Sequence, residues 1–155
     1  MSVAFRREGD DEHMEPKFER PIPPGPNRVT ARGLALIAAE LARVEALIPT
    51  LSDETALKVA RRDHRYWSTR QSSAELMPRP EGDKVAFGCT VTIRQNGKPR
   101  TITIAGDDEA DPARGLLSFS APLARAIMDA EVGELVDFAG KPDAIEIVAI
   151  VAASD

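Results

Sequence analysis

The sequence has few of the residues that build disulfides, metal sites and membrane anchors. It holds one cysteine, Cys89, and two histidines, His13 and His64. A single cysteine excludes an intramolecular disulfide, and neither histidine has a second ligand at zinc-binding spacing. No apolar run approaches the ~18 residues that cross a membrane, and the N-terminus lacks the apolar core of a secretory signal. We therefore expect a cytoplasmic chain with no metal site of its own and no membrane contact.

Basic charge is also scarce. The 155 residues include 20 Lys and Arg against 25 Asp and Glu, for a net charge of −5. This balance argues against non-specific binding to duplex DNA, which needs clustered basic residues, but it allows a protein partner that itself holds nucleic acid. The charge is uneven, with nine basic and six acidic residues at 28–79 and seven basic and thirteen acidic residues at 80–155. That contrast predicts two modules with different surfaces.

Residues 1–28 have no apolar period, and they predict a flexible tail. The segment is acidic and rich in proline, and its "PIPPGP" favours extended backbone and forbids a helix. A segment this polar buries too little apolar surface to fold by itself. Phe5 and Phe18 offer the alternative of a strap anchored on the folded part of the chain.

Residues 29–78 predict two helices. The first has Thr30 as its N-cap, and Pro49 prevents it from continuing. Its apolar residues repeat at spacings of three and four, as in a coiled-coil seam; they are Leu34, Ile37, Leu41, Val44 and Ile48. The second helix, with Thr50 or Ser52 as its cap, repeats more weakly at Leu57, Ala60, His64, Trp67, Gln71 and Ala74. The short loop between the helices predicts an antiparallel helical hairpin.

Residues 79–155 predict a small antiparallel sheet with one helix. Asn96-Gly97 separates two alternating runs, which is a strong β-hairpin pattern. Further strands are expected at residues 84–88, 116–120, 134–140 and 143–152. Ser120 would cap the helix, with Pro122 in its first turn and Gly133 near its end. The expected class is therefore α+β, a coiled-coil hairpin followed by a sheet domain.

Two adjacent acids, Asp53 and Glu54, lie at the expected tip of the helical hairpin. Acids at a helix N-terminus stabilise it by ~0.3–1 kcal/mol each, and that alone would explain them. Two carboxylates at the end of a helical rod can also help to hold a divalent metal in the active site of another protein. Residue types alone do not decide between these interpretations.

Two other charged groups are equally ambiguous. Arg61, Arg62 and Arg65 are either solvated arginines around a packed Trp67 or a basic face for an acidic partner or a phosphate. The acidic run at residues 107–111 is either a solvated loop or a site for a hard cation, although its spacing does not match an EF-hand. The sequence contains no phosphate-binding glycine loop and no nucleophile elbow. We find no self-contained catalytic site.

Four segments together resemble a known family. "VTARGLALIAAEL" and "RRDHRYWSTR" lie in the expected hairpin, and "VAFGCTVTI" opens the sheet domain. The most specific segment, "IAGDDEADPARGLLSFSAPLARAIMDAEVGELVDF", combines G-D-D-E-A-D with S-x-x-x-P-x-A-R-A. Over most of residues 29–150 the chain resembles the Gre family of bacterial transcription elongation factors, GreA and GreB. The resemblance implies a helical hairpin followed by an FKBP-like C-terminal domain.

The resemblance also implies a partner. Gre factors bind bacterial RNA polymerase, with the C-terminal domain at the rim of the secondary channel and the hairpin tip pointing at the catalytic centre. Two tip acids help to position a Mg²⁺ ion and water, and the polymerase then cleaves its own backtracked RNA. The chain would be an accessory factor and not an enzyme, with no cofactor beyond that shared Mg²⁺. It would be a monomer that contacts nucleic acid only indirectly, through the elongation complex.

Two motifs depart from the family pattern. Ser120, Ala121 and Pro122 fall where the C-terminal domain meets the polymerase, but family members usually have Asp or Asn and then Ser before the proline. The family tip is G-D-x-x-E-N-A-x-Y with acids three apart, whereas Asp53 and Glu54 are adjacent and diverge by ~100° on a helix. The hairpin is also shorter by about eight to eleven residues per arm, which removes roughly 12–16 Å of reach. We therefore expect weak or absent stimulation of transcript cleavage.

Two other functions remain open. A prolyl isomerase needs an aromatic-lined pocket, and residues 80–155 offer only Phe87, Phe119 and Phe138 as aromatics. A general interaction module would present the same hairpin to a different partner. A proline-peptide isomerisation assay and a pull-down from lysate distinguish these two functions from a polymerase-binding factor.

Overall fold

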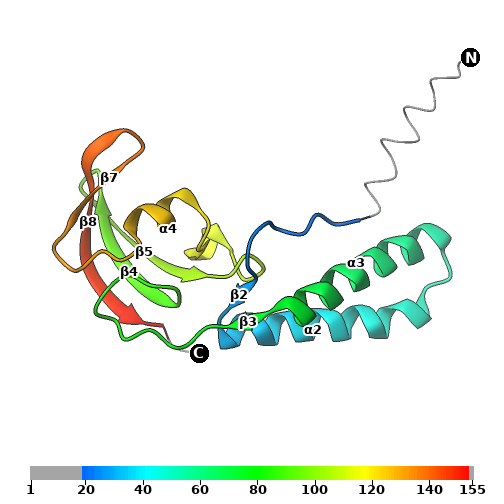
Figure 1. Cartoon of the computed structure of the whole chain (residues 1–155). Helices are drawn as coiled ribbons and strands as arrows, with labels where there is room; N and C mark the ends of the chain where they lie inside the picture. The colour runs from blue at the N-terminus through cyan, green and yellow to red at the C-terminus, as the bar shows by residue number, and fades with distance from the viewer. Residues whose placement is uncertain (1–18, 154–155) are drawn as a thin grey trace, which may run out of the picture. The chain divides into compact units, whose positions relative to one another are not determined.

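The computed structural model describes residues 19–153, which divide into two compact units (Figure 1). The helical unit comprises residues 19–25 and Ile37–Ser73, and the sheet unit comprises Pro26–Leu36 and the chain from Ala74 onward. Most of the predicted tail, residues 1–18, lies outside the described residues. The predicted α+β class is confirmed, because two long helices precede a sheet. None of the described helices is long and apolar enough to cross a membrane.

Both hairpin helices begin at a side-chain cap. Helix α2 (Ala31–Leu47) starts after Thr30, whose Oγ1 accepts a hydrogen bond from the Gly33 amide at 2.9 Å, as predicted. A 3₁₀ turn, η2 (Ile48–Thr50), then contains the proline that stops the helix. Helix α3 (Glu54–Ser73) starts after Asp53, whose Oδ2 accepts from the Ala56 amide at 2.8 Å. The predicted caps Thr50 and Ser52 are therefore wrong, because only Asp53 is adjacent to the first helical turn.

The buried seam between the helices follows the predicted spacing except near the end of α3, where the buried residue is Arg70 instead of Gln71. Ile37 and Val44 of α2 are buried, and so are Ala60 and Trp67 of α3. Gln71, predicted in the seam, is exposed, whereas Tyr66 and Arg70 are buried. An arginine can be buried along its aliphatic stem where its head finds partners, which a pattern of apolar residues does not reveal.

A two-stranded parallel sheet joins the start of α2 to the segment after α3 within the sheet unit. Strands β2 (Arg28–Val29) and β3 (Glu75–Leu76) pair through the Glu75 amide, which donates to the Asn27 carbonyl at 2.8 Å, and the Met77 amide, which donates to the Val29 carbonyl at 3.0 Å. Strands this short show no alternation, so the sequence did not predict them.

The main sheet has five strands in the order β6-β5-β4-β8-β7 (Figure 1). They are β4 (Cys89–Gln95), β5 (Lys98–Ala105), β6 (Leu116–Ser118), β7 (Leu135–Phe138) and β8 (Lys141–Ala152). The predicted β4–β5 hairpin is confirmed, with φ of 54° at Asn96 and 75° at Gly97. The fully antiparallel prediction is wrong at β5–β6, which pair in parallel. The loop between them carries the chain back before β6 begins, so both strands run in the same direction.

Two further predictions of the sheet domain are corrected. Residues 84–88 do not form a strand, because Val85 pairs through backbone hydrogen bonds with residues 129 and 130 and Gly88 has φ +88°. Helix α4 (Pro122–Ile127) is shorter than predicted, and its N-cap is Ala121 without a side-chain hydrogen bond. Ser120 is therefore not the cap. The buried side of the sheet and α4 together form one apolar core.

Candidate functional site

The hairpin tip uses Asp53 as a structural residue. Its Oδ2 accepts the Ala56 amide hydrogen bond that caps α3, and Glu54 follows as the first helical residue. Both side chains are exposed. An acid before the helix and an acid in its first turn both suit the positive end of the helix dipole. Helix capping thus accounts for the tip acids without a ligand. Within residues 19–153, no group of three or more His, Cys, Asp or Glu side chains is placed to hold a metal ion.

The basic face of α3, defined by Arg61, Arg62 and Arg65, is largely paired. The Arg62 Nη2 lies 3.0 Å from Oδ1 of Asp63. The Arg65 Nε donates to Oε1 of Glu19 at 3.1 Å, and this hydrogen bond lowers the pKa of the Glu19 carboxyl and raises that of the Arg65 guanidinium. Arg61 is exposed and has no ion-pair partner in the described chain. The face therefore offers less free positive charge than the sequence indicates.

Residues 19–25, here called the strap, contact α3. The Arg20 guanidinium lies 4.0 Å from the Tyr66 ring centroid and 5.2 Å from that of Trp67. Its Nη1 is 3.6 Å from Oδ1 of Asp63. A guanidinium over two aromatic rings is a favourable cation–π arrangement. No pattern in the tail sequence indicated this contact, because Arg20 and Tyr66 are distant in sequence and only the fold brings them together.

His64 links the two hairpin helices. Its Nε2 lies 3.1 Å from Oε2 of Glu45, which is on α2. Both side chains are partly exposed, at 37% and 56%. A base needs a reacting group within hydrogen-bond reach, and the partner of the His64 ring is a carboxylate, which is not a group that it would deprotonate. The pair is best understood as a cross-helix contact.

Residues 118–122, which lead into the first residue of α4, are called the docking turn after the binding that the sequence predicts for them, and the preceding acidic run fixes this turn. The Ser118 hydroxyl donates to Oδ1 of Asp107 at 2.6 Å, and the Ser120 hydroxyl donates to the same oxygen at 3.3 Å. The Ser120 amide donates to Oγ of Ser118 at 3.1 Å. Ser120 and Pro122 are exposed, and Ala121 is partly buried. This docking turn therefore presents the three predicted binding residues on a pre-organised backbone.

The acidic run is structural at two of its positions. Asp107 holds the docking turn, and Glu109 is only 8% exposed and accepts a hydrogen bond from the Thr30 hydroxyl at 2.7 Å. These oxygens are committed to the protein, which favours the structural interpretation over a cation site. Cys89 is buried, and its burial raises the pKa of the thiol, so it is a poor nucleophile.

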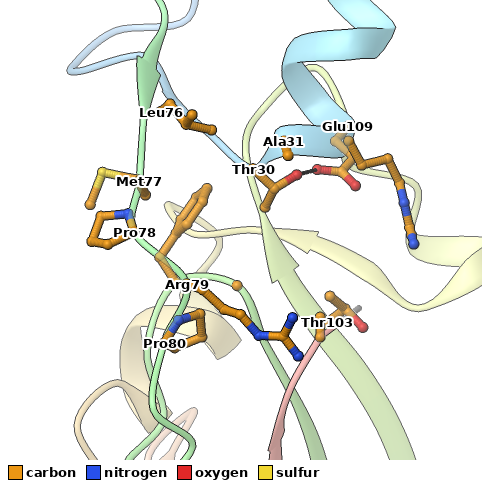
Figure 2. Close-up of a pocket in the computed structure, with 13 residues that line it drawn as sticks. Thr30, Ala31, Leu76, Met77, Pro78, Arg79, Pro80, Thr103 and Glu109 are labelled. Carbon is orange, nitrogen blue, oxygen red and sulfur yellow. Dashed lines mark hydrogen bonds between the residues drawn. The ribbon is translucent and has the colours of Figure 1, made fainter. Parts of the chain in front are cut away.

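The sheet unit also contains a cavity of about 300 Å³ (Figure 2). Its lining includes Leu76, Arg79, Pro80, Phe87, Thr103 and Glu109. Leu76 extends from β3 toward Thr30 and Ala31, and Arg79 points toward Thr103 (Figure 2). The Phe87 ring packs edge-on against Phe119 with centroids 5.6 Å apart, and Phe119 immediately precedes Ser120. The pocket and the docking turn therefore share an aromatic pair. We call this cavity the Phe87 pocket.

Part of the chain is similar to known transcription elongation factors. The model of the C-terminal domain of the transcription elongation factors GreA/GreB matches residues 79–153. The transcription elongation factor GreA of Desulfovibrio desulfuricans is 46% identical over 57 residues, covering 36% of this chain and 35% of that protein. GreA of Mesorhizobium japonicum is 43% identical over 58 residues, covering 36% of this chain and 37% of that protein. These matches thus span about a third of each relative's length.

One solved structure is also similar at a low level. The transcription elongation factor GreA/GreB from Nitrosomonas europaea is 18% identical, with 83% of this chain and 99% of that chain covered. Its TM-score is 0.40.

Proposed function

The chain belongs to the GreA/GreB family through residues 79–153, and we propose that it is a transcription elongation factor that binds bacterial RNA polymerase at the secondary channel. The observation that carries this proposal is the family match over the sheet unit, in a chain that also contains an antiparallel helical hairpin. In this proposal the sheet unit supplies the docking surface and the hairpin enters the channel. The chain acts on the polymerase and catalyses no reaction of its own.

The docking turn supports a specific contact surface. Asp107 holds Ser118 and Ser120, so the exposed Ser120 and Pro122 meet a partner without first being ordered. Pre-organisation reduces the entropy lost on binding. Before the proline, the family usually has Asp or Asn followed by Ser. The Ser-Ala of this chain keeps one hydroxyl and has no carboxylate. We therefore propose a contact made through shape and hydrogen bonds rather than an ion pair.

The hairpin tip supports weak or absent stimulation of cleavage. Asp53 already caps α3, and releasing its carboxylate to help hold Mg²⁺ would cost about 0.5–2 kcal/mol of helix stability. The two acids are adjacent rather than three apart. Helix α2 has 17 residues, or roughly 26 Å at 1.5 Å per residue. We propose that the hairpin regulates elongation by occupying the channel, with the catalytic Mg²⁺ held by the polymerase.

A binding titration tests this function. Fluorescently labelled full-length chain is titrated with purified bacterial RNA polymerase, and binding is followed by anisotropy. We expect saturable binding that weakens in Pro122→Ala and in Asp107→Ala, because the first removes a contact and the second releases the docking turn. Arg114→Ala, an exposed change elsewhere in the sheet unit, is the control. The absence of binding by the unmodified chain at micromolar concentrations contradicts the proposal.

A further inference from the structure

The Phe87 pocket is a preformed apolar cavity in the sheet unit. Its volume of about 300 Å³ is at the lower end of the ~300–1,000 Å³ found for small-ligand sites, so it suits one or two apolar side chains better than a large cofactor. Phe87 and Pro80 supply apolar lining. Leu76 at its edge is 59% exposed, which leaves a large apolar side chain in water.

The walls of the pocket are held rigidly. The β2–β3 backbone hydrogen bonds fix one side, and the bond between Thr30 and Glu109 fixes another (Figure 2). Gly106 packs so closely on β2 that an added Cβ would lie 2.3 Å from the Arg28 carbonyl oxygen. The Gly88 amide donates to the Ile104 carbonyl at 2.9 Å. A cavity with walls fixed in this way receives a side chain at little cost in ordering.

The charge at the pocket is divided. Glu109 is buried, and its carboxylate accepts a hydrogen bond from Thr30. Arg79 is exposed, and no carboxylate among residues 19–153 forms an ion pair with its guanidinium. The available charge is therefore positive, and it favours a partner segment with an acidic side chain close to its apolar one.

An aromatic pair links the pocket to the docking turn. Phe87 lines the pocket, and its ring packs against Phe119, the residue before Ser120. The Arg28 guanidinium covers the other ring of the pair, 5.4 Å from the Phe119 centroid. A partner seated on the docking turn thus lies beside a residue whose neighbour, Phe119, contacts the wall of the pocket.

From these observations we propose that the Phe87 pocket receives a large apolar side chain from an acidic segment of RNA polymerase, with Arg79 pairing with the acid. This inference rests on the proposed binding to polymerase, and it adds a second contact to the docking turn. A free small molecule and an unrelated protein are the competing occupants, and the experiment below separates them from the polymerase.

The first test is affinity for purified RNA polymerase, measured with full-length variants. Arg79→Glu reverses the free charge, and Ala31→Phe places a ring at the pocket from an exposed position. We expect each change to raise the Kd about tenfold, with Arg79→Glu losing part of the salt dependence. Arg114→Glu and Ala113→Phe are the matched controls, since both are exposed in the 3₁₀ turn η3 (Pro112–Arg114) and lie outside the pocket.

Three outcomes are distinguishable. Weakening by the two pocket variants, with controls within about twofold of the unmodified chain and unchanged unfolding midpoints, is the expected result. If the pocket variants bind normally while Pro122→Ala binds weakly, the pocket inference fails and the proposed function stands. The pocket would then serve a small molecule or an unrelated protein. If the unmodified chain does not bind, the proposed function itself fails.

Crosslinking identifies the occupant directly. Cys89 is fully buried, so Leu76→Cys introduces one reactive thiol at the edge of the pocket. A thiol-linked photocrosslinker at position 76 should capture a polymerase peptide in which an acidic residue lies close to a Leu, Phe or Met. Capture of a peptide without an acidic residue overturns the inference. So does a failure of the probe at position 76 to crosslink any more than a control probe at position 114 when binding is saturated.

Discussion

At the scale of single residues, Asp53 illustrates how a helix cap can resemble a catalytic acid. Its carboxylate oxygen lies 2.8 Å from the Ala56 amide nitrogen. We expect Asp53→Ala to lower the free energy of unfolding of the chain by ~1 kcal/mol, because it removes this cap. Asp53→Asn keeps a capping oxygen and should cost much less. Chemical denaturation followed by circular dichroism measures both, and equal stability of Asp53→Ala and the unmodified chain would contradict the capping role.

Gly106 is a second residue with a defined structural demand. A Cβ at this position would lie 2.3 Å from the Arg28 carbonyl oxygen, which is backbone and cannot rotate away. We expect Gly106→Ala to destabilise the chain by about 1–3 kcal/mol, as overpacking does.

Gly33→Ala is the matched control for Gly106→Ala. Its Cβ would meet Oε1 of Glu109 at 3.1 Å, a side-chain atom, and alanine favours the helix by about 1 kcal/mol over glycine. The control should therefore be close to neutral in thermal unfolding. Equal losses in the two variants would show that the contact with Arg28 is not what requires glycine at 106.

At the scale of elements, the strap is the feature with the clearest spectroscopic readout. Trp67 is the only tryptophan of the chain, and Arg20 lies over its ring. The Arg20 side chain is partly exposed, and a cation–π contact near the surface contributes only ~0.5–1 kcal/mol, so removing it should release the strap without unfolding the hairpin. We expect Arg20→Ala to increase acrylamide quenching of Trp67 fluorescence. Arg61→Ala, on the same helix but outside the strap contact, should leave quenching unchanged, and equal quenching in both variants would argue against the strap.

The strap should also respond to acid. The hydrogen bond from Arg65 lowers the pKa of the Glu19 carboxyl from its ordinary 4.5. Because this pKa is lowered, the ionised Glu19–Arg65 pair stabilises the folded contact fully at a pH above the ordinary pKa. The stabilisation is lost as the pH falls through the lowered pKa of the folded chain. Quenching of Trp67 should therefore rise as the pH falls below 4.5. Glu19→Gln should show no such rise, and an identical pH profile in that variant would contradict the assignment to Glu19.

Sequence patterns predicted the elements that are determined by neighbouring residues in the chain. Three-and-four spacing predicted both helices, and Asn96-Gly97 predicted the β4–β5 turn. They did not predict contacts between distant segments, such as the cation–π contact of Arg20 with Tyr66, the pairing of β2 with β3, or the hydrogen bond between Asp107 and Ser118. Such contacts leave no period in the sequence. The candidate site was therefore predicted as a set of residues, whereas the hydrogen bonds that position them came only from the structure.

At the scale of the whole molecule, the likeness to GreA/GreB rests on the sheet unit and the regulatory proposal rests on the hairpin. The family match covers residues 79–153 and does not reach the tip. In the proposed function, the sheet unit binds the polymerase, and the effect on transcription depends on what the hairpin then does. A hairpin that reaches the catalytic centre would stimulate cleavage, whereas a shorter one would only occupy the channel.

RNA cleavage in a backtracked RNA polymerase complex tests this account most directly. The complex is incubated with the chain alone, with a cleavage-competent Gre factor alone, and with both. We predict that the chain alone leaves cleavage at the rate of polymerase by itself, and that it slows the competent factor in a concentration-dependent manner. Pro122→Ala should compete less well. Rapid cleavage by the chain alone, abolished by Asp53→Ala or Glu54→Ala, would contradict the account.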